Sequence, residues 1–226
     1  MSTGAGAAPS SARDLSRATP SGEDEATERA RTTIVDTGAT SDERQVVDAV
    51  LAGDAGAFRK LVERESRSVI ATCTRILGDR AEAEDVAQEA FVIAYRSLAT
   101  WRADGPFGAW LSRIAVRLAI RRAAQRKQVA WLDPIEGTGT GDERVRAAGD
   151  GADPASSLLR SERDAELRAA VAALDEPYRE VVAMRFFAER SLAEIAAATD
   201  RPLGTVKTHL HRGLARLRRS LDETDR

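Results

Sequence analysis

The sequence has 226 residues, of which 42% are hydrophobic, 31% charged and 4% aromatic, and its net charge is -2. Abundant helix-forming residues and scarce aromatic ones favour an all-α fold and argue against an all-β protein. No apolar run approaches the roughly 18 residues of a membrane span, so membrane insertion is not expected. The single cysteine, Cys73, excludes an internal disulfide and a multi-cysteine zinc site and is expected to be a buried structural thiol.

Composition divides the chain into four parts. Residues 1–41 are rich in small and polar residues without periodic apolar positions, so we expect a disordered extension. Its first residues lack the apolar segment of a secretory signal. Residues 128–156 contain seven Gly and Pro residues and are expected to form a flexible linker. Residues 42–127 and 157–222 remain as two small helical domains.

Charge is distributed unevenly over these parts. Residues 46–127 carry 10 acidic and 14 basic residues, a net charge of +4, whereas residues 1–45 and 128–163 carry -3 each. Two segments, 113–127 and 201–219, contain six basic residues each and no acidic residue. The near-neutral total, which by itself argues against a nucleic-acid partner, therefore conceals two basic segments.

The first domain is predicted to be helical throughout. Asp42 and Gln45 suit a capping box at the start of a short helix. Gly78-Asp79 is expected to end the second helix, and Gly105-Pro106 interrupts the chain before the fourth. The expected helices lie at 43–52, between Asp54 and Gly78, at 80–99 and at 107–126.

The fourth helix carries apolar residues on two sides. At about 100° per residue, one arc holds Phe107, Trp110, Leu111, Ile114 and Leu118. Beside that arc, basic residues follow at steps of four: Arg113, Arg117 and Arg121. Because Val116 and Ile120 fall on the far side, we expect this helix to make a second apolar contact.

The second domain ends in a pattern typical of a helix-turn-helix. Ser191 and Glu194 form an S-x-x-E capping box, and Asp200–Leu203 provides a turn of four residues before a longer basic helix. The expected helices lie at 157–173, from Asp175-Glu176-Pro177 onward, at 192–199 and at 204–221.

The last helix separates an apolar stripe from a polar face. Val206, Leu210, Leu214, Leu217 and Leu221 fall within about 80° of one another. The remaining surface carries candidate contacts to a DNA major groove, where Arg and Lys reach guanine edges or phosphates and Thr and His reach either. These candidates are Thr205, Lys207, Thr208, His209, His211, Arg212 and Arg216. The alternative is a solvated face on a helical bundle; the capped helix and turn just upstream favour DNA.

The segment before the fourth helix offers a different nucleic-acid site. Trp101, Arg102 and Asp104 lie next to the basic helix. Single-stranded DNA is bound by cationic grooves and aromatic stacking, and a flipped base needs a small polar-edged pocket. The alternative places Trp101 in the core or at its rim, and Phe107 and Trp110 are expected to be core residues.

An acidic cluster on the third helix has two interpretations. Asp85, Gln88 and Glu89 lie on neighbouring turns of one face. That face is either solvated or a docking surface for a basic partner, and spacing alone favours the solvated face.

Catalytic motifs are missing from the sequence. His209 and His211 are two residues apart, so they do not share a helix face, and neither has a nearby Cys or Asp for a metal site. Gly-rich phosphate loops, serine nucleophile motifs and Cys-His pairs are absent as well. The sequence therefore predicts no enzyme, no metal site and no cofactor.

Taken together and in this order along the chain, the motifs resemble those of an RNA polymerase sigma factor in the compact extracytoplasmic-function group of the sigma-70 family. The family's polymerase-binding helix is similar to GDRAEAEDVAQEAFVIAYRSL (78–98), and its promoter-melting helix is similar to FGAWLSRIAVRLAIRRAAQRK (107–127). Its carboxy-terminal helix-turn-helix is similar to residues 174–221, where the spacing GTVK-x-x-x-x-R is the most specific signal.

The resemblance implies roles for the matching residues. The clamp helices of the polymerase β′ subunit would be bound by Asp85, Gln88 and Glu89. A flipped base of the -10 element would enter the loop 101–106, and its strand would be held by Arg113, Arg117 and Arg121. The -35 element would be read by Lys207, Thr208, His211 and Arg212.

The resemblance also implies partners: core RNA polymerase (β′ clamp helices and β flap), promoter DNA and an anti-sigma factor, in the cytoplasm. Two positions depart from the family pattern, because many relatives carry Ser-Arg at Thr208-His209 and Asn at Arg117. A stand-alone helix-turn-helix DNA-binding transcription regulator is the alternative. It would leave the acidic helix and the loop 101–106 without a purpose.

Overall fold

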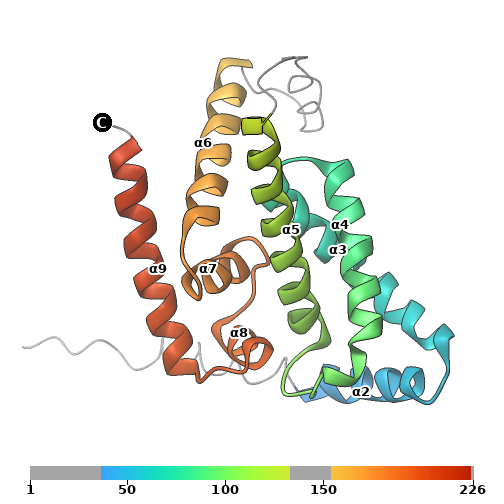
Figure 1. Ribbon diagram of the computed structural model, residues 1–226. Helices are drawn as coiled ribbons and strands as arrows, with labels where there is room; N and C mark the ends of the chain where they lie inside the picture. Colours follow the sequence, from blue (N-terminus) through green and yellow to red (C-terminus); the bar gives the residue numbers. More distant parts are fainter. Residues whose placement is uncertain (1–36, 133–153, 225–226) are drawn as a thin grey trace, which may run out of the picture. The chain divides into compact units, whose positions relative to one another are not determined.

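The computed structural model describes residues 37–132 and 154–224, and these ranges contain helices and no strand (Figure 1). The predicted all-α fold is thereby confirmed. The elements are α2 (Thr37–Leu51), α3 (Ala55–Leu77), α4 (Arg80–Arg96), the 3-10 turn η1 (Leu98–Thr100), α5 (Phe107–Leu132), α6 (Pro154–Ala173), α7 (Tyr178–Phe186), α8 (Leu192–Thr199) and α9 (Leu203–Thr224). Among the described helices, none is long and apolar enough to cross a membrane.

Local capping fixes the boundaries of α3 and α4. Asp54 accepts hydrogen bonds from the backbone N–H groups of Gly56 and Ala57 at 3.0 and 3.2 Å, which satisfies free donors at the start of α3. Gly78 adopts a left-handed conformation (φ 72°) and ends that helix. Asp79 then accepts the N–H of Glu82 at 3.1 Å and starts α4. These ends agree with the sequence prediction.

The first predicted helix was misplaced at its start. Helix α2 begins at Thr37, so Asp42 lies inside the helix and does not cap it. Next to Asp42, the nearly buried Glu43 accepts the backbone N–H of Phe107 at 2.8 Å and pairs with Arg64 at 2.6 Å. Burial raises the pKa of Glu43, an effect partly offset by the Phe107 N–H and the Arg64 charge. These contacts hold α2 against the start of α5.

The predicted linker was too long at both ends. Helix α5 continues to Leu132 and α6 begins at Pro154, because neither stretch has a residue that forces an earlier end. The rest of the expected linker, 133–153, and most of the expected disordered extension, 1–36, lie outside the described residues.

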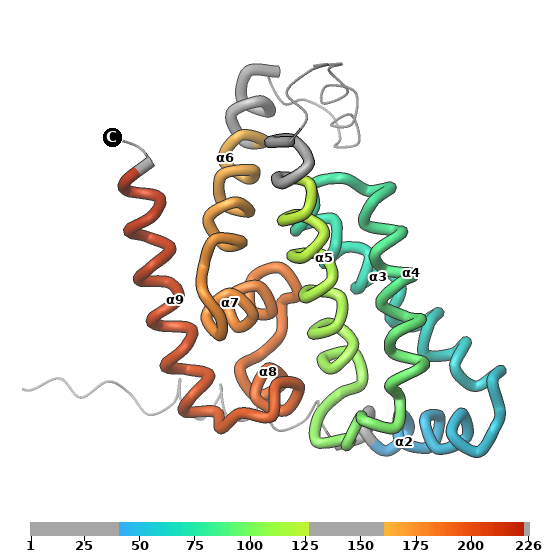
Figure 2. Tube along the Cα trace, viewed as in Figure 1, coloured from blue at the N-terminus to red at the C-terminus, as the bar shows by residue number. Residues whose placement is uncertain are grey.

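Helix α5 is the central element and is buried on two sides. Phe107 and Leu111, which belong to one apolar arc of the helix, are fully buried. Val116 and Ile120 are also buried and line a hollow shared with Arg179 and Glu180 of α7. The chain path in Figure 2 shows α5 between α3–α4 and α6–α7. The second apolar side of this helix therefore receives the second half of the chain.

Cys73 lies in the core of the first half, as expected. Its side chain is fully buried, and burial raises the pKa of the thiol to about 12. The thiol is consequently protonated and unreactive at neutral pH.

Candidate nucleic-acid interface

The helix-turn-helix is fixed by bonds within a few residues. Ser191 accepts the N–H of Glu194 at 3.2 Å, and the Glu194 carboxylate accepts the N–H of Ser191 at 2.8 Å, which completes the predicted capping box of α8. Asp200 ends α8 in a left-handed conformation (φ 56°). The N–H of Thr205 then bonds the carbonyl of Pro202 at 2.9 Å and begins α9.

Helix α9 packs closely on α7 and leaves a basic surface outside. Val206 is fully buried, and a Cβ at Gly213 would lie 2.7 Å from a methyl of Val182, so only glycine permits this approach. The outer surface exposes four of the residues predicted to contact DNA: Lys207, Thr208, His211 and Arg212. Their position is compatible with entry of α9 into a major groove.

The three other predicted contacts on α9 are partly buried. Thr205 is half-buried. His209 meets the ring of Tyr178 edge to face at 5.7 Å, and its Nδ1 is buried without a hydrogen-bond partner. Arg216 lies over the same Tyr178 ring at 4.4 Å and pairs with Asp175 at 2.8 Å. His209 and Arg216 therefore pack α9 against Tyr178 of α7.

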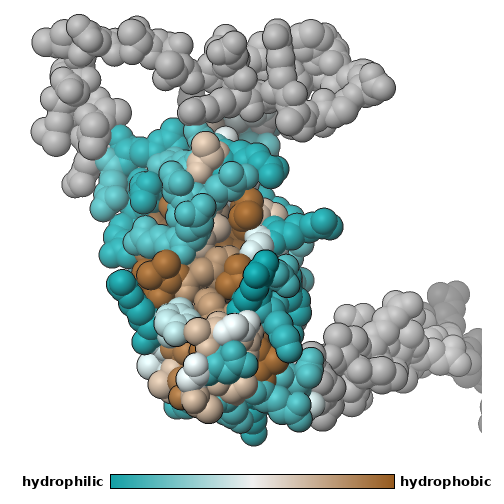
Figure 3. Space-filling model, turned by 90° about the vertical axis from the view of Figure 1, so that its right-hand side faces the viewer, coloured by the Kyte–Doolittle hydropathy of each residue, from teal (hydrophilic) through white to brown (hydrophobic). Residues whose placement is uncertain are grey.

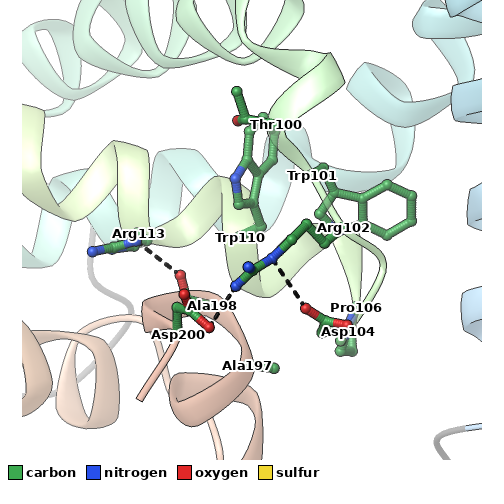
Figure 4. Close-up of a pocket in the computed structure, with 11 residues that line it drawn as sticks. Thr100, Trp101, Arg102, Asp104, Pro106, Trp110, Arg113, Ala197, Ala198 and Asp200 are labelled. Atoms are coloured by element: carbon green, nitrogen blue, oxygen red, sulfur yellow. Dashed lines mark hydrogen bonds and ion pairs between the residues drawn. The ribbon is translucent and has the colours of Figure 1, made fainter.

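The loop before α5 forms one side of a cavity of about 340 Å³ (Figure 4). Its lining includes Trp101, Arg102, Asp104 and Trp110. Trp101 is half-buried and meets Phe107 edge to face at 5.9 Å, so it belongs to the rim of the core and to the cavity at once. Arg102 pairs with Asp104 at 3.3 Å. An aromatic wall with charged edges suits a flat heteroaromatic base.

The arginines of α5 meet a buried carboxylate from the other half of the chain. Glu180 of α7, only 1% exposed, accepts bonds from Arg113 at 2.8 Å and Arg117 at 2.7 Å, and Arg201 reaches its second oxygen at 2.9 Å. Burial alone raises the pKa of Glu180, but the Arg113 bond and the charges of Arg113 and Arg117 outweigh it, so the pKa is held below its usual value. Arg121 is exposed.

An exposed acidic and apolar face lies on α4. Asp85, Gln88 and Glu89 are exposed, as expected, and Glu89 lies 3.6 Å from Arg122. Val92, three residues beyond Glu89, and Tyr95, three residues beyond Val92, are each 48% exposed and extend the same face. Figure 3, which views the side where α3 and α4 lie in Figure 1, shows apolar surface between hydrophilic patches. A mixed surface of this kind is typical of a protein-binding site.

Sequence reasoning missed Glu180, Val92 and Tyr95. The pattern around Val92 and Tyr95 is that of an ordinary helix face, and only their exposure distinguishes them. Glu180 stands beside the apolar run of α7, but its partners on α5 are 63 and 67 residues away. Within the described residues, no group of His, Cys, Asp and Glu side chains is arranged to hold a metal ion.

Comparison with known proteins relates both halves of the chain to one family. Residues 61–129 match Sigma-70 region 2, and residues 164–217 match Sigma-70, region 4. The chain is 34% identical to the ECF RNA polymerase sigma factor SigW of Bacillus subtilis over 77% of this chain and 94% of that protein. It is 33% identical to the RNA polymerase sigma-H factor of Pseudomonas aeruginosa over 75% and 89%, respectively.

A third curated relative agrees with this relationship. The chain is 32% identical to the ECF RNA polymerase sigma-E factor of Escherichia coli K12 over 74% of this chain and 87% of that protein. Among solved structures, that of CnrH in complex with the cytosolic domain of CnrY is 23% identical, with a TM-score of 0.49 over 80% of this chain and 97% of that chain. With both family regions present in order on an all-helical chain, the protein belongs to the ECF RNA polymerase sigma factors of the sigma-70 family.

Proposed function

We propose that this sigma factor uses residues 42–127 as domain 2 and residues 157–222 as domain 4, and that it directs core RNA polymerase to promoters with -35 and -10 elements. The observation that carries the proposal is the outer surface of α9. Lys207, His211 and Arg212 are exposed on a helix whose other side is packed against α7, directly after a capped α8. This is the arrangement that a major groove accepts.

The -35 element is assigned to the exposed part of α9. Arg212 and Lys207 provide long cationic side chains for guanine edges or phosphates, while Thr208 and His211 provide shorter polar ones. Thr205, His209 and Arg216 act mainly through the placement of the helix, because they are wholly or partly engaged in packing.

The -10 element is assigned to the cavity and to the adjoining α5. Trp101 and Trp110 offer aromatic surface for a flipped base, and Arg102 and Asp104 offer polar edges. The strand that carries the base would continue along Arg113, Arg117 and Arg121, whose charges suit phosphodiester groups.

We assign the binding of core polymerase to the exposed face of α4. Asp85, Gln88 and Glu89 supply the acidic and polar part of the surface for the β′ clamp helices, and Val92 and Tyr95 supply its apolar part. Charged residues would steer the encounter, while the apolar pair would give most of the affinity. The second half of the chain would contact the β flap.

Family membership supports the remaining assignments. We propose that the protein works without catalysis of its own, in the cytoplasm where core polymerase and promoter DNA are found, and that an anti-sigma factor regulates it.

The test is transcription by purified bacterial core polymerase on fragmented genomic DNA, with transcript starts mapped by sequencing. A shared -35 and -10 pattern upstream of starts that need this protein is expected. No core binding and no dependent transcripts would refute the proposal. A stand-alone helix-turn-helix regulator would instead protect a palindrome without polymerase, since such proteins bind as two-fold dimers.

A further inference from the structure

Helix α5 takes an N-terminal cap from another helix. It begins at Phe107, and the two residues before it, Gly105 and Pro106, have no side chain that can accept a hydrogen bond. The first N–H groups of a helix need such an acceptor, because they have no partner within the helix. Glu43 of α2 supplies it, since its carboxylate accepts the N–H of Phe107 at 2.8 Å. By contrast, α3, α4 and α8 are capped by the residue directly before them.

The Glu43 carboxylate is itself held on its other side. Its second oxygen accepts a bond from Arg64 of α3 at 2.6 Å, and only 5% of the Glu43 side chain is exposed. Arg64 in turn pairs with Glu65 at 2.9 Å. A carboxylate with a charged donor on one oxygen and a backbone donor on the other has little freedom to move. The backbone of Phe107 is thereby fixed to α2 and α3.

Phe107 connects this fixed point to the walls of the cavity. Its fully buried ring meets Trp101 edge to face at 5.9 Å and lies 5.5 Å from the ring of Trp110. Both tryptophans line the cavity of about 340 Å³ that we assign to the flipped base (Figure 4). Aromatic rings at these distances attract each other in a defined geometry, so a shift of Phe107 would displace both walls.

Helix α2 also holds the middle of the loop. Ala103 has a left-handed backbone (φ 56°), which costs free energy for a residue other than glycine and persists only where the surroundings impose it. The Ala103 carbonyl accepts a bond at 3.5 Å from Arg44, the residue after Glu43. Two neighbouring residues of α2 therefore hold the loop at Ala103 and its end at Phe107.

We infer that Glu43 is a positioning residue for the -10 base: it caps α5 from α2 and so fixes the Phe107 ring on which Trp101 and Trp110 rest. Glu43 does not line the cavity, so it acts through Phe107 and not through contact with DNA. The inference rests on the proposed function, since it takes this cavity as the -10 site.

The experiment measures how much of the DNA affinity depends on one base. Holoenzyme assembled from this protein and purified core polymerase is titrated with fluorescent single-stranded DNA that carries the -10 pattern found by mapping transcript starts. A series of the same strand lacks one base at each position in turn. Because stacking of a single base contributes substantially to affinity, removal of the cavity base should weaken wild-type binding about tenfold.

Glu43→Ala should abolish this base dependence. We expect it to bind the complete strand about tenfold more weakly than the wild type and to lose no further affinity when the cavity base is removed. Glu43→Gln should keep most of the base-dependent affinity, because an amide oxygen can still accept the Phe107 N–H. The control is Asp42→Ala, which removes the same charge at an exposed position of α2 and should resemble the wild type. All four proteins should bind core polymerase equally.

Three results would overturn the inference. Equal losses by Glu43→Ala on the complete strand and on the strand without the cavity base would point to a general loss of structure, which lowers both affinities. Retention of the full base dependence in Glu43→Ala would show that the cap is not needed. A Glu43→Gln protein as impaired as Glu43→Ala would show that the acceptor for Phe107 is not the cause.

Phe107→Leu tests the same path while the carboxylate stays in place. The backbone N–H can remain on Glu43, whereas the aromatic contacts with both tryptophans are lost. We therefore expect the same loss of base dependence as in Glu43→Ala. If Glu43→Ala does not fold, as judged by circular dichroism, this variant decides, and an unchanged base dependence would refute the inference.

The wild type separates this inference from the proposed function. If wild-type holoenzyme gives promoter-dependent transcripts and one base position governs its affinity, the proposed function stands and the variants alone decide the role of Glu43. If no base position matters to the wild type, the assignment of the -10 base to this cavity fails, and the inference fails with it.

Discussion

Glu180 and Arg113 lie 67 residues apart in sequence and 2.8 Å apart in the structure. Glu180 is buried at 1% exposure, and the arginine side chain is 25% exposed, so this pair joins α7 to α5 largely out of water. The same carboxylate holds Arg117 and Arg201. One side chain of the helix-turn-helix half thereby neutralises part of the basic segment of the other half.

Replacing Glu180 should therefore destabilise the chain. Glu180→Gln leaves three arginines facing a neutral group, and we expect the free energy of unfolding to fall by about 3 kcal/mol at pH 7. Urea denaturation followed by circular dichroism measures this change. The control is Glu189→Gln, which removes an exposed pair with Arg75 and should cost no more than about 1 kcal/mol. Equal effects of the two substitutions would contradict the role given to Glu180.

The environment of His209 should make the stability of the folded chain depend on pH. Burial lowers the pKa of His209, and the charges of Arg201 and Arg212 lower it further. Because the unfolded chain then binds the proton more readily than the folded one, stability falls as pH drops below about 6.5. Urea midpoints at pH 7.5 and 5.5 measure this loss, which should be smaller in His209→Gln. A variant that keeps the full wild-type loss would exclude His209 as its source.

Shortening two side chains of α9 should impair -35 recognition alone. Lys207→Ala and Arg212→Ala each remove an exposed cation, and we expect transcription from -35-dependent promoters to fall about 5- to 100-fold. Binding to core polymerase should stay unchanged, as measured by fluorescence anisotropy. Arg67→Ala, an equal loss of charge on α3, is the control. Loss of core binding in the α9 variants would show that this surface has another role.

The α4 surface should govern binding to core polymerase. Asp85→Ala with Gln88→Ala, and separately Tyr95→Ser, should each weaken core affinity about tenfold or more, as expected for central interface residues. Both should leave the helical content unchanged, because the side chains are exposed. Glu63→Ala on α3, whose side chain is 64% exposed, serves as the control. Unaltered core affinity in both α4 variants would remove the assignment.

Much of the local structure was predictable from short-range patterns. The Ser191 capping box, the left-handed Gly78 and the caps at Asp54 and Asp79 act within four residues, so their geometry is encoded where they stand. Exposure of Asp85, Lys207 and Arg212 followed from helical periodicity in the same way. The burial of Glu43 was not predictable, because its hydrogen-bond donor is the N–H group of Phe107, 64 residues away in the sequence.

The sequence by itself determined the helices, the polar and apolar faces and the two basic segments of this sigma factor. Only the tertiary structure decided which of those faces are free. Arg113 and Arg117 belong to an acid-free segment, yet both lie on Glu180, whereas Lys207 and Arg212 remain exposed. The physical reason is the distance along the sequence over which each kind of interaction acts. Helix periodicity and capping are set by neighbours within a turn, while neutralisation of a charge depends on whichever side chain the fold brings within about 3 Å.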